Sequence, residues 1–324
     1  MKVSKKSFII TEAVLGILVL ILAVMMLREN NGEPLGRVSV IVRDSDNAQW
    51  AAFKYGIRMA AQDRGVEAVI VGTESVMTTE EERELIESEI GKGADAVIVQ
   101  PVPGEGVEEM LQKVKKKVPV MLVEALDSGN GKASEFPVTA ADDYAMGQAL
   151  AREVLEDYSG NLEGKTLGIV SRTTDSEVTA RRTEGFCDAL EGTGAEVSWR
   201  VAGNFDNGEE DYLGGQEKVD FVAALDDSSL TAAGAYSASD GLNGALLYGI
   251  AHSTQAAYYL DTGSVECLVV PDGFHVGYQS MSEIADGMEQ LFYKEKDQVV
   301  SYTVLRRETM FSKENQELLF TMSQ

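Results

Sequence analysis

Beyond residue 36 the chain alternates short apolar runs with amphipathic stretches of helical length. The apolar runs are rich in Val and Ile and lie at 38–42, 68–71, 96–99 and 118–123. The amphipathic stretches lie between them at 48–63, 79–90 and 106–117. Continuous apolar runs of this length are typical of strands buried on both faces of a parallel sheet. The order βαβαβαβ therefore predicts right-handed crossovers and a doubly wound sheet.

The same pattern begins again in the second half of the chain. A helix is predicted around 178–190, and further strands are predicted at 167–170, 197–201, 221–225, 245–248 and 267–270. No period of 20–50 residues is present, which excludes solenoids and propellers. The pattern predicts two similar α/β halves.

The N-terminal region differs from the rest, because residues 7–27 form a mainly apolar run whose only charge is Glu12. A helix of this length reaches about 31 Å, enough to cross a hydrocarbon core of roughly 30 Å. Lys2, Lys5 and Lys6 precede the run, so the positive-inside rule places the N-terminus in the cytoplasm and the main domain outside. We expect residues 1–35 to form a signal anchor with one transmembrane helix and a linker, and a single-pass protein of the cell membrane.

Two alternatives for this segment stay open: a cleaved secretory signal and a buried core helix. Cleavage requires small residues in an Ala-x-Ala pattern after the apolar run. The run ends Ala23-Val24-Met25-Met26-Leu27 instead, which favours the uncleaved anchor.

Charge and residue usage exclude several functions. Lys and Arg number 28 against 53 Asp and Glu, a net charge of −25, and such a surface repels phosphate backbones, so no nucleic-acid partner is expected. Two cysteines and two histidines are too few for a metal cluster, and no cofactor is expected.

Enzymatic motifs are also missing from the sequence. It contains no Gly-x-Ser-x-Gly elbow and no Walker loop, so we expect no enzyme. Adjacent acids such as Asp142-Asp143 are typical of helix caps and solvated surface.

Polar residues follow several predicted strands, at the sheet edge where open α/β folds bind ligands. Helix capping alone also explains any single one of them. Trp50, one of two tryptophans, stands beside Asn47 and Gln49. An aromatic face next to amides suits a polyhydroxylated ring, because the ring stacks and the amides bond its hydroxyls.

At these residues the chain resembles the type I periplasmic binding proteins, in particular the ribose- and xylose-binding branch of bacterial sugar receptors. The matching positions are Asn47-Ala48-Gln49-Trp50, Gln100-Pro101, Glu124, Arg182 four residues before Phe186, Asn204-Phe205-Asp206 and Asp226-Asp227. The resemblance covers nearly all of 37–322. It implies two doubly wound parallel-sheet lobes joined by a three-segment hinge, with lobes of 36–141 plus 273–300 and of 142–271 plus 302–324.

The resemblance also implies a site for a small polar ligand, such as a sugar, between the lobes. Trp50 and Phe205 are expected to enclose its apolar face, with Gln49 beside Trp50. Its polar groups are expected to bind Asn47, Gln100, Glu124, Arg182 and Asp226. The alternative for Arg182 is a solvated helix residue like Arg181.

Three positions depart from the family pattern. Ala125 replaces an arginine, Ala251 lies where a Gly-Phe-Asp-Gly turn has aspartate, and Pro271 replaces the hinge glutamine. These changes remove three polar contacts of the usual pentose site. His252 and Asp272 are the candidates to replace them.

The expected role is a membrane-tethered receptor that closes its lobes around a ligand and signals to a membrane partner such as a sensor histidine kinase. A permanent tether favours this role because it raises the effective concentration for one membrane partner. The alternative is the substrate-binding component of an ABC sugar importer, with its permease as partner.

Overall fold

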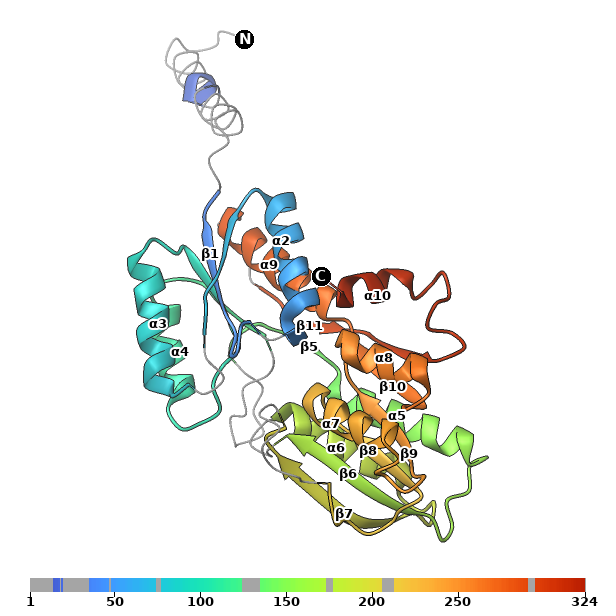
Figure 1. Ribbon diagram of the computed structural model, residues 1–324. Helices are drawn as coiled ribbons and strands as arrows, with labels where there is room; N and C mark the ends of the chain where they lie inside the picture. The colour runs from blue at the N-terminus through green and yellow to red at the C-terminus, as the bar shows by residue number, and fades with distance from the viewer. Residues whose placement is uncertain are drawn as a thin grey trace, which may run out of the picture.

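The computed structural model describes residues 14–17, 19, 35–46, 48–73, 77–123, 135–172, 177–205, 213–290 and 295–323. Beyond residue 35 these residues form two α/β lobes, one above the other in Figure 1.

Each lobe contains one six-stranded sheet. The elements of the first lobe are β1 (Arg37–Ile41), η1 (Ala48–Trp50), α2 (Ala51–Arg64), β2 (Glu67–Ile70), α3 (Thr79–Gly91), β3 (Ala96–Val99), α4 (Val107–Lys115), β4 (Val120–Val123), β5 (Val138–Ala141), α9 (Gly273–Glu289) and β11 (Gln298–Val300). Those of the second lobe are α5 (Asp143–Asp157), β6 (Thr166–Arg172), α6 (Glu177–Leu190), β7 (Glu196–Gly203), β8 (Phe221–Ala224), α7 (Asp227–Ala238), β9 (Leu246–Ile250), α8 (Thr254–Thr262), β10 (Cys267–Pro271), β12 (Tyr302–Arg306) and α10 (Gln316–Met322).

The first sheet is parallel, in the order β11-β5-β4-β3-β1-β2, and helices cover both of its faces. Val40 packs on one face with residues of α2 and α9, whereas its neighbour Ile41 packs on the other with residues of α3 and α4. Burial on both faces explains why β3 and β4 are apolar at every position.

The second sheet repeats this plan in the order β12-β10-β9-β8-β6-β7. Residues of α5 and α6 share one core cluster with strand residues, and residues of α7, α8 and α10 share the other. Strand β12 is the exception to the parallel arrangement, because it pairs antiparallel with β10.

The chain passes between the lobes three times: after β5, after β10 and after β11. The crossings lie together, since Val300 pairs with Ala141 and Pro271 pairs with Tyr302. The backbone N–H of Asp272 also donates to the carbonyl of Ser301 (3.3 Å).

The C-terminal helix α10 touches both lobes. Met322 is buried in the core of the second lobe. Phe320 packs edge-on against Tyr55 of α2 in the first lobe, with ring centroids 6.1 Å apart. The helix therefore forms a noncovalent connection besides the three crossings.

The fold class predicted from the sequence, α/β with two parallel-sheet lobes, is confirmed. All nine predicted strands lie within two residues of a strand of the structure. Strands β5, β11 and β12 had no clear signal in the sequence. Most of their residues are only partly buried, so these strands need not be apolar at every position, as β3 and β4 are.

Among the described residues, no helix has the length and hydropathy needed to cross a membrane. Most of the apolar segment 7–27 lies outside these residues.

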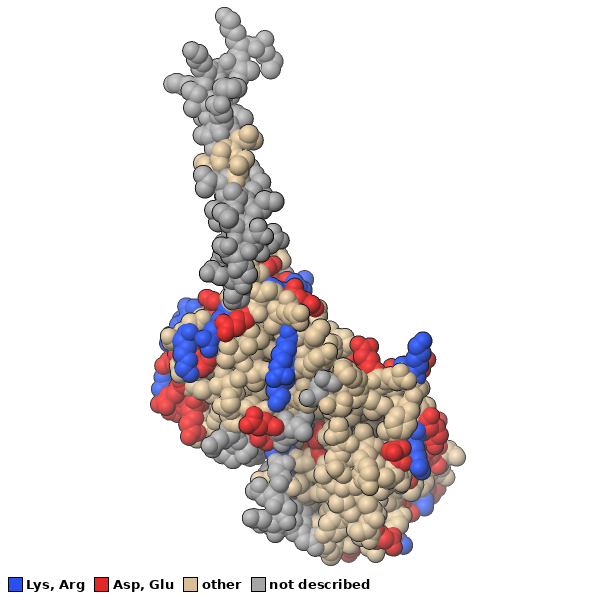
Figure 2. Space-filling model, turned by 45° about the horizontal axis from the view of Figure 1, so that its top comes forward, with Lys and Arg blue, Asp and Glu red and all other residues tan. Residues whose placement is uncertain are grey.

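Charge is unevenly distributed over the surface. Residues 219–293 contain no Lys or Arg, and they include α7, α8 and α9. Much of the face of the second lobe shown in Figure 2 is accordingly uncharged, whereas charged side chains gather at the edges.

Each lobe is built around one tightly packed pair of helices. A Cβ on Gly56 of α2 would lie 2.1 Å from the Phe274 carbonyl of α9, and one on Gly277 of α9 would lie 2.1 Å from the Phe53 carbonyl of α2. In the second lobe Gly147 of α5 and Gly185 of α6 make the equivalent contacts. Only glycine allows these backbones to approach so closely.

Gly147→Ala should lower the free energy of unfolding by about 1–3 kcal/mol, because its Cβ would lie 2.1 Å from the Arg182 carbonyl. The control is Gly91→Ala at the end of α3, where no atom lies within 4 Å of the added Cβ. That change should leave the free energy unchanged or raise it by up to about 1 kcal/mol. Denaturant unfolding measures both, and equal effects would contradict the packing argument.

Candidate functional site

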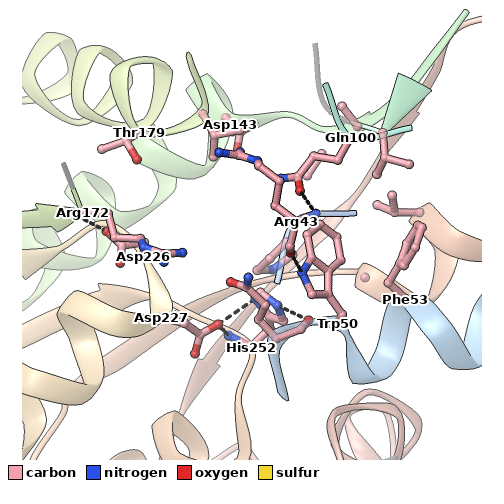
Figure 3. A pocket seen from close by; sticks show the side chains of 18 of the residues that line it. Arg43, Trp50, Phe53, Gln100, Asp143, Arg172, Thr179, Asp226, Asp227 and His252 are labelled. Carbon is pink, nitrogen blue, oxygen red and sulfur yellow. Dashed lines mark hydrogen bonds and ion pairs between the residues drawn. The ribbon is translucent and has the colours of Figure 1, made fainter. Parts of the chain in front are cut away.

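A cavity of about 460 Å³ lies between the lobes, within the range of small-ligand sites. Its walls are carboxyl ends of strands from both sheets and the first turns of helices that follow them (Figure 3). The first-lobe wall includes Arg43, Asp44, Gln49, Trp50, Phe53, Met77, Gln100, Pro103 and Val123. The second-lobe wall includes Asp143, Arg172, Val178, Thr179, Arg182, Asp226, Asp227, Ser228 and His252.

Trp50 is the aromatic centre of the first-lobe wall. Its indole Nε1 donates to the Arg43 carbonyl (2.9 Å), and its ring packs edge-on against Phe53 at 5.3 Å. The side-chain oxygen of Gln100 accepts from the backbone N–H of Arg43 (3.0 Å). These contacts fix the orientation of the indole before any ligand arrives.

Arg182 lies on the second-lobe wall and is mostly buried, with 13% of its side chain exposed. Its Nε donates to Asp143 (2.8 Å) and its Nη1 to the Leu225 carbonyl (3.0 Å). Of the five N–H groups of the guanidinium, three make no hydrogen bond to the described residues. Burial raises the pKa of Asp143, and the charge of Arg182 opposes that rise.

Asp226 caps the beginning of α7. Its carboxylate accepts from the backbone N–H groups of Arg172 (2.6 Å) and Ser229 (3.0 Å). Burial raises its pKa, and these two hydrogen bonds act in the opposite direction. Asp226 therefore both caps a helix and lines the cavity.

Asp227 and His252 form an ion pair on the second-lobe wall of the cavity. Asp227 Oδ2 lies 2.8 Å from His252 Nδ1. Burial alone would raise the pKa of Asp227, but the charge of His252 and hydrogen bonds from His252 and Ser253 lower it to about 2. His252 Nε2 lies 2.6 Å from the Gln49 carbonyl oxygen of the first lobe.

Five of the eight residues predicted for the site line this cavity: Gln49, Trp50, Gln100, Arg182 and Asp226. Phe205 does not, because it packs against the α7–α8 core cluster of the second lobe. Asn47 and Glu124 lie outside the described residues, as does Ala125.

The residue that orients Arg182 is Asp143, which forms an ion pair with it. Asp143 was interpreted as a cap or as solvated surface. The cap is the neighbouring residue Asp142, whose side chain accepts from the backbone N–H of Ala145.

Within the part of the chain that the structure describes, no group of acidic, His or Cys side chains is placed to hold a metal.

Arg43, Asp143 and Asp227 were missed as wall residues, although the sequence carried a signal for Arg43 and for Asp227. Arg43 directly follows the first predicted strand, and Asp227 follows Asp226 at a strand end. Asp143 begins the helix after a crossing between lobes, which the hydrophobic pattern alone does not reveal.

Comparisons with known proteins agree with this architecture. The family described as "Periplasmic binding protein domain" matches residues 38–288. No curated protein matches the chain.

Solved structures with this fold share little sequence with the chain. A carbohydrate transporter solute-binding protein from Agrobacterium radiobacter, in complex with D-arabinose, is 17% identical, with a TM-score of 0.76 over 88% of this chain and 98% of that one. An ABC transporter solute-binding protein from Bacillus halodurans with bound myo-inositol is 18% identical, with a TM-score of 0.74 over 89% and 99%. A putative LacI transcriptional regulator from Bacteroides fragilis is 15% identical, with a TM-score of 0.71 over 85% and 98%.

Glu82 of α3 supports the cavity wall from behind. It is fully buried, and its Oε1 accepts from the backbone N–H of Val102, next to the wall residue Pro103. Its Oε2 is buried without a hydrogen-bond partner among the described residues. Burial raises the pKa of Glu82 from 4.5 to about 7, so the folded protein holds this proton more tightly than the unfolded chain.

Because the pKa of Glu82 is raised in the folded state, stability should fall as pH rises from 4.5 through 7. Glu82→Gln removes the buried charge and should raise the free energy of unfolding by about 2–3 kcal/mol at pH 8, but by little at pH 5. Denaturant unfolding at both pH values measures this.

The control is Glu89→Gln on the same helix. Glu89 also has little exposed surface (3%), but it is paired with Lys92 (2.7 Å) and Ser39 (3.1 Å), and these contacts outweigh burial and lower its pKa. This change should therefore destabilise the protein at pH 8. A gain from Glu82→Gln that is the same at both pH values would contradict the explanation.

Proposed function

The chain belongs to the periplasmic binding protein domain family, and from this we propose that it is a receptor, not an enzyme, that binds a small polar solute of the sugar class between its lobes. The observation that carries the proposal is the cavity between the lobes, lined by an oriented tryptophan on one side and by Arg182 and Asp226 on the other. The fold is shared with solute-binding proteins named with D-arabinose and myo-inositol.

In the proposed complex the face of Trp50 stacks on the C–H face of the ligand. Arg182, already oriented by Asp143, donates its remaining N–H groups to adjacent hydroxyls, while Asp226 and Gln100 bind others. Phe205 lies outside the present cavity, so its part in enclosing the ligand stays a prediction, as do those of Asn47 and Glu124.

The moving units in this proposal are the lobes 36–141 plus 273–300 and 142–271 plus 302–324, with the three crossings as the hinge. A hinge needs few residues to absorb the rotation. The crossings at 142, 272 and 301 are each one residue between regular elements, which suits that role.

We place the receptor outside the cytoplasm, held to the cell membrane by residues 7–27. The support is the apolar sequence of this segment and the lysines before it. The tether favours signalling to a membrane partner such as a sensor kinase. The second candidate is the binding component of an ABC importer, which the names of the similar structures favour.

Loss of a buried, charge-assisted hydrogen bond should weaken ligand binding by about 1.5–3 kcal/mol, roughly tenfold to over a hundredfold. We expect this from Arg182→Ala and a comparable loss from Trp50→Ala, measured by calorimetry after screening pentoses, hexoses and inositols. The matched control is Arg181→Ala, because Arg181 is half exposed and pairs with Glu184 outside the cavity. Parental affinity in both cavity variants, with the fold intact by circular dichroism, would place the site elsewhere.

Signalling and transport are separated in a deletion strain. If the receptor signals, the strain should lose ligand-induced transcription and keep ligand uptake. Re-expression of the full chain should restore the response, whereas residues 36–324 exported by a cleavable signal should restore it poorly. Lost uptake with unchanged transcription would instead identify the importer component.

A further inference from the structure

His252 makes a direct contact between the lobes. His252 comes two residues after β9 in the second lobe, and its Nε2 lies 2.6 Å from the backbone carbonyl oxygen of Gln49 in the first lobe. Its Nδ1 lies 2.8 Å from Asp227 Oδ2 within its own lobe. Figure 3 shows the ring between Asp227 and the segment that carries Trp50.

Both partners of the ring accept hydrogen bonds and donate none, since one is a carbonyl and the other a carboxylate. A neutral imidazole has a single N–H, whereas the imidazolium has two. Only the protonated ring therefore donates to both partners. In either neutral tautomer a lone pair faces an oxygen lone pair.

Asp227 is held in place independently of the ring. Its carboxylate accepts from the backbone N–H groups of His252 (2.9 Å) and Ser253 (3.0 Å). The carboxylate is thus fixed in the second lobe, and the bond that depends on the arrangement of the lobes is the one to Gln49.

The charges around the ring favour its protonated form. Burial would lower the pKa of His252, but the charge of Asp227 and the bonds to Asp227 and Gln49 outweigh burial and the opposing Arg182, so the pKa is raised. The other charged residues of the cavity wall are Arg43, Asp44, Asp143, Arg172 and Asp226. Together with Arg182 they carry three positive and three negative formal charges, which cancel. The negative charge of Asp227 is then balanced only by a positive charge on the His252 ring.

We propose that His252 is a proton-dependent clasp, which joins the lobes through Gln49 when the ring is protonated and releases them when it is neutral. The inference rests on the proposed function in one respect, that the lobes open and close. In this proposal a proton, besides the solute, is a second ligand that binds the closed arrangement of the lobes more tightly than the open one. Closing raises the proton affinity of His252, so low pH favours closure, and closure is lost as pH rises through the closed-state pKa.

The protonation of the ring is directly measurable, because the chain has only two histidines. NMR of the full chain in detergent micelles, with 13C-labelled histidine, should show His252 titrating above its ordinary pKa of 6.5. Asp227→Asn should lower that pKa by about one unit or more. The single side-chain oxygen of asparagine keeps one of the two hydrogen bonds that Asp227 accepts from the backbone. A neutral His252 at pH 6 in the parent would overturn the proposal.

Lobe separation is measured by pulsed electron resonance between spin labels on two exposed residues, Glu108 of α4 and Asp261 of α8, in a Cys187→Ser background. The remaining Cys267 is buried, so we expect the label not to reach it. No ligand is added, so a failed ligand screen does not affect this test. We expect a longer mean distance at pH 9 than at pH 6 in the parent.

The matched pair of variants is His252→Gln and His275→Gln. His275 also lies against an aspartate, Asp272 (2.6 Å), but this pair lies within three residues at the beginning of α9. His252→Gln should give the same distance at both pH values, and His275→Gln should keep the parental response. If His252→Gln does not fold, Asp227→Asn replaces it, and the distance change should then occur at lower pH.

Two results would overturn the clasp. One is a parental distance that stays constant while NMR shows His252 losing its proton. The other is a distance change that persists in His252→Gln.

Discussion

The close approach of two helix pairs is the constraint on which the cavity depends. Helices α2 and α9 in the first lobe, and α5 and α6 in the second, touch through glycines that meet the backbone carbonyls of the neighbouring helix. Gly147 lies against the carbonyl of Arg182, and Gly277 lies against that of Phe53. The side chains on the two walls are therefore placed by backbone contacts, which allow much less adjustment than contacts between side chains.

The polar groups of the cavity are largely bonded to one another before a ligand binds. Asp143 orients Arg182, the backbone holds Asp226, and Asp227 pairs with His252. Such pairing offsets the cost of removing charges from water. In the proposed complex, selectivity would therefore depend on the unused donors of Arg182 and on the apolar face of Trp50.

The fold was largely predictable, because strands buried on both faces must be apolar at every position and β3, β4 and β8 are. The wall of the cavity was predictable where a polar residue comes at the end of such a strand, as with Gln100 after β3 and Asp226 two residues after β8. Asp143 was not, because its position depends on a crossing whose strand, β5, is short and only partly buried. Phe205 follows a strand as well but packs against the core of its own lobe, because an aromatic residue at such a position can face either the cavity or the core.

The C-terminal helix has a consequence for the mechanics of the molecule. It belongs to the second lobe through Met322 but meets the first through Phe320 and Tyr55. Any rotation of the lobes must slide or separate these two rings, and dispersion between rings decays within a few ångströms. If the lobes move as proposed, the contact between Phe320 and Tyr55 resists that motion, although neither ring lines the cavity.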